Sequence, residues 1–120
     1  MLKQDKHCSI MPYFKIHDGK LDEFKAGVAA FVEKTRIEPA CLYYGFTFHG
    51  NRALCREGYA DAEGVLAHID NIGELLQQAL TIAEIERLEI HGPKAELDKL
   101  REPLSELSPE YFELEDGFIR

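Results

Sequence analysis

The segment Cys41–His49 constrains the fold of this chain more than any other part of the sequence. It is rich in aromatic residues, which favour β-strands, and alternation along a strand divides its side chains between two faces. One face carries Leu42, Tyr44, Phe46 and Phe48, and the other carries Cys41, Tyr43, Gly45 and Thr47. Because both faces carry apolar or aromatic side chains, we expect both faces of the sheet to be covered.

The rest of the sequence alternates between strand and helix signals. Residues 8–16 read as a first strand, and a turn signal with Asp18 as a helix N-cap follows. Apolar positions spaced by three and four predict a helix from Leu21 that ends before Pro39. A Gly50-Asn51 turn leads into a strand over residues 52–59. Asp61 is a second N-cap signal, before a helix with an apolar stripe. This stripe consists of Val65, Ile69, Ile72, Leu76 and Leu80, extended by Leu75 and Ala79.

Residues 83–91 have strand character, although their Glu and Ala content leaves a helical continuation open. Pro93 suits a first helical position, Pro103 is expected to split the helix pattern over residues 97–107, and residues 111–114 form a short strand. The element order is that of a ferredoxin-like βαββαβ α+β sandwich with an antiparallel sheet. We expect a tail over residues 1–7, a domain over 8–92 and a helix-strand extension over 93–120 that covers the sheet edge.

The second face of this sheet needs cover of its own, because two helices shield only one face of a four-stranded sheet. Burial against the same face of a second subunit would shield the other, which predicts a homodimer through sheet faces. Two alternatives stay open: Tyr43 lies flat on a half-wet surface, or the C-terminal extension covers it.

Composition narrows the range of partners and locations. The chain has 120 residues, with 14 Lys and Arg against 22 Asp and Glu, and a formal charge of -8. This balance opposes nucleic acid as a partner, because phosphate binding needs Lys and Arg. No stretch approaches the roughly 20 apolar residues of a spanning helix, and the start lacks a secretory signal. Three widely spaced cysteines suggest reduced thiols and a cytoplasmic protein without membrane contact.

His68 is the first candidate for chemistry. It shares the apolar helical stripe with Val65 and Ile72, so we expect its imidazole to be buried and to need a partner. Glu57 or Tyr44, on strands that the helix should cover, could provide one. In the functional interpretation His68 lines a pocket and transfers protons near neutral pH. The alternative is a core histidine that holds helix to sheet.

Aromatic residues admit the same two interpretations. They either line a cavity for a small apolar ligand or fill the core of a domain without Trp. The candidate ligand-binding residues are Phe14, Tyr44, Phe46, Phe48, Glu57, Tyr59 and Ile72. We expect no metal site, because no HxH or HExxH spacing occurs, and no cofactor site, because a P-loop and a dinucleotide-binding glycine pattern are absent.

Two segments resemble the antibiotic biosynthesis monooxygenase-like proteins, a family of small dimeric α+β barrels that includes quinol monooxygenases. Residues 38–44, Glu-Pro-Ala-Cys-Leu-Tyr-Tyr, are similar to the family's E-P-G-C-x-x-Y segment. Residues 57–63, followed by His68, are similar to its E-x-W…H segment, with Tyr59 in place of Trp. The resemblance covers roughly residues 8–92.

This resemblance implies a dimeric α+β barrel that binds a small hydrophobic ligand, aromatic, quinol-like or fatty-acyl-like. If the protein is an enzyme, the resemblance implies cofactor-independent monooxygenation with His68 as the base or the phenolate-stabilising donor. Haem degradation is rejected, because the positions of the helical Trp and the later His of the haem-degrading relatives hold His68 and Gln78 here. The alternative is a non-catalytic ligand-binding or structural dimer.

Overall fold

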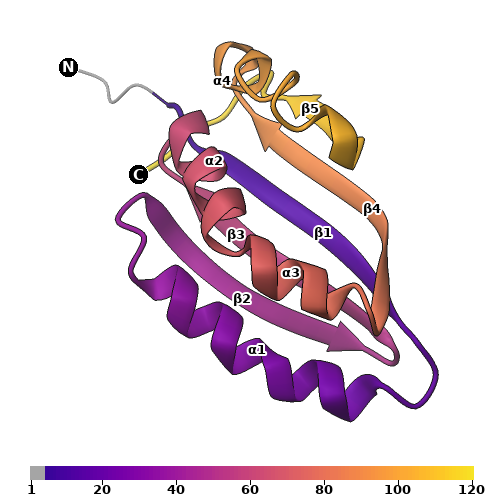
Figure 1. Ribbon diagram of the computed structural model, residues 1–120. Helices are drawn as coiled ribbons and strands as arrows, with labels where there is room; N and C mark the ends of the chain where they lie inside the picture. Colours follow the sequence, from indigo (N-terminus) through magenta and orange to yellow (C-terminus); the bar gives the residue numbers. More distant parts are fainter. Residues whose placement is uncertain (1–4) are drawn as a thin grey trace.

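Helices α1, α2 and α3 cover one face of a five-stranded sheet in the computed structural model, which describes residues 5–120 (Figure 1). The strand order is β2-β3-β1-β4-β5, antiparallel except for the parallel pair β4 and β5. The elements are β1 (Cys8–Ile16), α1 (Leu21–Arg36), β2 (Cys41–His49), β3 (Arg52–Tyr59), α2 (Ala62–Asn71), α3 (Gly73–Ala79), β4 (Ala83–Gly92), α4 (Lys94–Asp98), the 3-10 turn η1 (Ser105–Leu107) and β5 (Glu110–Glu113). The predicted ferredoxin-like α+β fold is confirmed.

The starts of the two long helices differ in how well local sequence predicted them. Asp61 caps α2 as expected, because its side chain accepts a hydrogen bond of 2.8 Å from the Gly64 N–H. Asp18 does not cap α1. A turn at Gly19, where φ is +78°, lies between Asp18 and the helix. Lys20 therefore occupies the N-cap position, and its side chain makes no capping hydrogen bond. The acidic residues Asp22 and Glu23 in the first turn favour this start through the helix dipole.

The apolar stripe after Asp61 forms two helices instead of one. Ile72 separates α2 from α3 with φ −99° and ψ 7°, and Gly73, a poor helix former, begins α3. The Ile72 N–H still bonds to the His68 carbonyl, and the Leu76 N–H bonds to the Ile72 carbonyl. The two helices therefore continue along the sheet with a bend between them, and Ile72 stays buried at that bend.

A bulge in β2 overturns part of the alternation predicted for Cys41–His49. Cys41 pairs with Tyr59 and Tyr43 pairs with Gly58, so Leu42 is the extra residue. Cys41 consequently packs against the helix-covered core, instead of sharing a face with Tyr43, and Leu42 is exposed. Beyond the bulge the predicted alternation holds: the helix-covered face of β2 is defined by Tyr44, Phe46 and Phe48.

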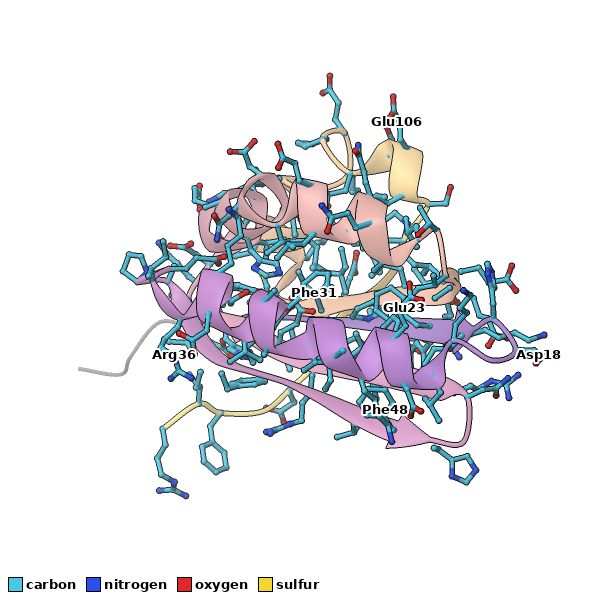
Figure 2. All side chains as sticks on the ribbon, turned by 60° about the horizontal axis from the view of Figure 1, so that its bottom comes forward. Asp18, Glu23, Phe31, Arg36, Phe48 and Glu106 are labelled. Atoms are coloured by element: carbon cyan, nitrogen blue, oxygen red, sulfur yellow. The ribbon has the colours of Figure 1, made fainter. Side chains whose placement is uncertain are left out.

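The core lies between the helices and this covered face, which we call the inner face. The rings of Phe14 and Phe24 lie 5.5 Å apart in a tilted arrangement in one part of it, and the rings of Phe31 and Phe46 lie 5.6 Å apart. Figure 2 shows Phe31 between α1 and the layer of α2 and α3. We call the opposite face, which no helix covers, the outer face; Tyr13, Tyr43 and Leu54 lie on it.

The C-terminal residues continue the sheet and reach the start of α2. β5 runs parallel to β4, while Leu97, Leu100 and Leu104 are buried against the inner core. The buried Glu96 accepts a 3.0 Å hydrogen bond from the Ala62 N–H, a backbone donor in the first turn of α2. The segment after β4 therefore helps to hold the helix that carries His68.

Replacing Glu96 with Gln is expected to lower the free energy of unfolding by about 1 kcal/mol near neutral pH, because the Ala62 N–H loses a charged acceptor. The Ala62 N–H, aided by Lys99, lowers the pKa of Glu96 in the folded protein. A lowered pKa stabilises the fold above the unfolded pKa, and this contribution is lost as pH falls through the folded pKa. Urea unfolding should show the difference between wild type and Glu96→Gln shrinking below about pH 4.5. A difference that grows on acidification would contradict the assignment.

Candidate functional site

His68 lies between two carboxyl groups, and the three side chains form what we call the Glu38–His68–Glu57 array. His68 Nδ1 is 2.9 Å from Glu38 Oε2, and His68 Nε2 is 3.2 Å from Glu57 Oε1. His68 is 2% exposed and Glu57 is 4% exposed, so water does not separate these charges. The array has the arrangement of a proton-transfer group, in which each ring nitrogen faces an oxygen that can hold or accept a proton.

Local sequence explains why the array forms where α2 crosses β3. Capping by Asp61 sets the start of α2 and turns His68 toward the sheet together with Val65. Alternation along β3 turns Glu57 toward the helix, between the buried Cys55 and Tyr59. Both predicted partners of the imidazole lie close to it: Glu57 Oε1 is 3.2 Å from Nε2 of His68, and the ring of Tyr44 lies 5.3 Å from the imidazole ring.

Glu38 is the member of the array that sequence analysis missed as a partner of His68. It lies in the loop after α1, and Asn71 holds it: Asn71 Nδ2 donates to Glu38 Oε2 at 2.7 Å and to the Lys34 carbonyl at 2.9 Å. With the Asn71 amide donating to Glu38, the same carboxyl can accept the Nδ1–H of His68. Nε2 is then the nitrogen that faces Glu57. The signal available in the sequence was the spacing of three between His68 and Asn71 on one helix.

Burial dominates the electrostatics of Glu57 and raises the pKa of its carboxyl group. The nearby His68, the Tyr59 hydroxyl and the Cys55 thiol oppose this rise. The Tyr59 hydroxyl donates to Glu57 Oε1 at 2.6 Å, and burial followed by the charge of Glu57 raises the pKa of Tyr59, so that hydroxyl keeps its proton. Glu57 therefore has hydrogen-bond partners for its charged form, while burial favours its protonated form.

An almost entirely apolar cavity of about 40 Å³ opens beside the array. Of the residues predicted to bind a ligand, Phe14, Tyr44, Phe46, Glu57 and Ile72 line it, together with His68. Its volume accommodates a few water molecules and is far below the roughly 300 Å³ of a typical small-molecule pocket. A larger ligand can enter only if surrounding side chains move.

Two predicted residues lie elsewhere. Tyr59 stands behind Glu57, where it donates its hydrogen bond without lining the cavity. Phe48 lies toward the end of β2 below α1, as Figure 2 shows, where it packs against Phe24 and under Lys25. A residue that was not predicted, Cys55, lines the cavity beside Glu57; burial, more than the nearby Glu57, raises the pKa of its thiol.

One solved structure is similar to nearly the whole of this chain. MupZ from Pseudomonas fluorescens has a TM-score of 0.92 and 53% sequence identity, over 96% of this chain and 95% of MupZ. The chain belongs to the MupZ family. No protein-family model and no curated protein matches the sequence.

More distant structures share the fold of this MupZ relative. A proposed antibiotic biosynthesis monooxygenase from Nitrosomonas europaea has a TM-score of 0.66 and 16% identity, over 78% of this chain and 96% of the other. Rv0793 from Mycobacterium tuberculosis has a TM-score of 0.64 and 16% identity, over 72% and 94%. The resemblance to antibiotic biosynthesis monooxygenase-like proteins is therefore confirmed for the fold.

Residues 5–120 lack two further features, a metal-binding cluster and a membrane-spanning helix. No group of three or more His, Cys, Asp or Glu side chains in this range is arranged to hold a metal ion. None of its helices combines the length and the hydropathy needed to cross a bilayer.

Replacing Glu57 with Gln is expected to stabilise the protein progressively, relative to wild type, as pH rises. The raised pKa of Glu57 means that its contribution to stability is complete below the unfolded pKa near 4.5 and is lost as pH rises through the folded pKa. Gln preserves shape and hydrogen bonding without this loss. Urea unfolding between about pH 5 and about pH 8 measures the difference. If the free energy of unfolding of wild type instead rose relative to that of Glu57→Gln over this range, the attraction of the Glu57 carboxylate to His68 would outweigh the cost of burying its charge.

Proposed function

We propose that this protein is an enzyme that performs acid–base catalysis on a small, mainly hydrophobic molecule bound between the sheet and its helices. One observation carries the proposal: Glu57, a carboxyl group with a raised pKa, lies 3.2 Å from Nε2 of His68 at the polar end of an apolar cavity. Strongly perturbed groups that converge on a cavity are typical of active sites. A neutral core imidazole pairs one ring nitrogen with an acceptor and the other with a donor, whereas His68 has a carboxyl group within 3.2 Å of each ring nitrogen.

In this proposal His68 and Glu57 are catalytic residues and Glu38 is a positioning residue. His68 Nε2 and Glu57 exchange protons with the substrate at the cavity wall. Glu38 holds Nδ1 and stabilises the imidazolium that forms when His68 takes up a proton. The apolar walls formed by Phe14, Phe46 and neighbouring side chains exclude water and strengthen these interactions.

Cofactor-independent monooxygenation is the first reaction that such a site could perform, and the distant neighbour described as a proposed monooxygenase supports it. His68 would remove a proton from an activated CH₂ group of a quinol-like substrate, and the resulting carbanion would reduce molecular oxygen. The CH₂ group becomes a carbonyl, and the second oxygen atom leaves as water. The substrate supplies the electrons, and the protein supplies a base in a dry cavity.

The raised pKa of Glu57 favours a second, non-oxidative reaction. A carboxyl group that keeps its proton can donate it to a substrate oxygen, which facilitates breaking or forming a carbon–oxygen bond, as in the elimination of water. In this reaction Glu57 is the general acid and His68 the base that receives the second proton. Molecular oxygen takes no part, which separates the two candidates experimentally.

Replacing His68 with Asn is expected to reduce kcat/KM by about 100-fold or more, because general acid–base groups contribute roughly that much. An oxygen electrode and product analysis with a panel of quinols measure turnover, and Gln77→Ala on the exposed side of α3 serves as the matched control. Conversion without oxygen uptake supports the non-oxidative reaction. Unchanged oxygen uptake by His68→Asn would contradict the role of His68. A co-purified hydrophobic molecule in native mass spectrometry, without turnover, would support the non-catalytic alternative.

We also propose that two copies pair through the outer face of the sheet, forming an α+β barrel homodimer of a cytoplasmic protein. Tyr13 and Leu54 lie opposite each other there, half-buried and without helices above them. Tyr43 packs across Gly58, against His7, and stays 37% exposed. Tyr13, Tyr43 and Leu54 are large side chains on a face that no helix covers, which favours a second copy as their cover.

Replacing Leu54 with Asp is expected to convert the dimer to a monomer without unfolding it, because two buried carboxylates would face each other across the interface. Sedimentation velocity of wild type and variant at equal concentration measures the change, with Gln77→Asp on the helical side as the control. Wild type sedimenting as a monomer would contradict the dimer and would favour the interpretation in which Tyr43 lies on a half-wet surface.

A further inference from the structure

We propose that the hydroxyl groups of Thr35 and Tyr44 form a binding subsite for one uncharged oxygen of the substrate, next to the Glu38–His68–Glu57 array. This inference rests on the proposed function and specifies the ligand: a hydrophobic molecule that carries a hydroxyl or carbonyl group. Thr35 belongs neither to this array nor to the residues predicted from the sequence to bind a ligand.

Thr35 carries an unusual buried group. It lies in the last turn of α1 with 1% of its surface exposed, and its Oγ1 atom has no hydrogen-bond partner among residues 5–120. A buried hydroxyl without a partner lowers stability, and nearly all such groups in proteins are paired. Valine has almost the same shape and would avoid this cost. The retained hydroxyl is therefore explained if a bound molecule satisfies it.

Tyr44 connects Thr35 with the array. It lines the apolar cavity together with Glu57 and His68, and it also lines a surface groove of about 220 Å³ together with Thr35. Burial, then the charges of Cys55 and Glu57, raises the pKa of the Tyr44 hydroxyl. The Thr35 hydroxyl lies close enough to oppose this rise, although the geometry between the two hydroxyl groups falls short of a hydrogen bond. Tyr44 therefore keeps its proton and can donate a hydrogen bond, while Thr35 can donate or accept one.

The charges around this pair define the ligand. Glu57 is the cross-strand neighbour of Tyr44, and the ring of His68, which lies beside Glu38, is 5.3 Å from the ring of Tyr44. Arg36 also lines the groove, but its side chain is 67% exposed and paired with Glu33, so solvent screens its charge. The buried carboxyl groups of Glu38 and Glu57 therefore disfavour a carboxylate or phosphate more than a hydroxyl or carbonyl oxygen. An oxygen bound by Thr35 and Tyr44 would place the adjoining carbon atoms beside His68, where proton transfer is proposed.

Binding of 4-ethylphenol and ethylbenzene, two probes that differ by one hydroxyl group, tests the subsite by NMR titration. Wild type and Thr35→Ser should bind 4-ethylphenol more tightly than ethylbenzene. Thr35→Val should bind 4-ethylphenol roughly fivefold more weakly, the equivalent of one hydrogen bond, and ethylbenzene with unchanged affinity. Equal binding of 4-ethylphenol by Thr35→Val and wild type would overturn the subsite while leaving the acid–base function intact. If wild type binds neither probe, the hydrophobic cavity and the subsite are both overturned.

Thermal unfolding of the same variants separates a binding role from a structural one. Because Thr35 Oγ1 has no partner in the protein, Thr35→Val should unfold at the same temperature as wild type or at a higher one. Thr35→Ser, which keeps the hydroxyl and loses a methyl group, should unfold at a lower temperature. A lower unfolding temperature for Thr35→Val than for wild type would overturn the subsite, since the hydroxyl would then be holding the fold.

Discussion

Placing two carboxyl groups and an imidazole inside an apolar layer is the constraint on which the rest of this structure depends. An isolated buried charge is too costly for a domain of this size, so each polar atom of the array needs a partner. Tyr59 and His68 serve Glu57, and Asn71 and His68 serve Glu38. These residues come from two elements, β3 and α2, and from the loop after α1, which means that the array forms only when these parts pack together.

Each part of the fold contributes to that packing in a definable way. The Asp61 cap sets the rotation of α2, and alternation along β3 presents Glu57 to it. The segment after β4 adds a second constraint, because Glu96 binds the first turn of α2. A C-terminal extension that continues the sheet as β5 is thus coupled to the candidate site through one helix.

The small volume of the cavity bears on how such a site could work. A cavity of about 40 Å³ admits at most a few water molecules beside Glu57 and leaves no room for a quinol-sized molecule. The bend at Ile72 and the short helix α3, none of whose residues is buried, lie above the cavity and are the least constrained part of its wall. A substrate that entered by displacing these side chains would also displace that water.

Sequence patterns predicted the fold well because the decisive signals are local. The bounds of β1, β2 and β3 and the Asp61 cap follow from alternation, turn residues and side-chain capping within a few positions. The errors are also physical. Strict alternation cannot reveal the bulge at Leu42, which moved Cys41 to the inner face, and a continuous apolar stripe cannot reveal the bend that Gly73 permits.

Local sequence was enough to establish the βαββαβ order and to point to His68, Glu57 and Tyr44, because a polar residue on an apolar stripe stands out in one dimension. It could not show that Glu38 reaches His68 across 30 positions, or that Thr35 lies beside Tyr44 without a partner. Those relations depend on the distances between α1, α2 and β2, which exist only after the helices have packed on the sheet. The arrangement of the site is therefore a property of packing, whereas its most conspicuous residues are a property of the sequence pattern.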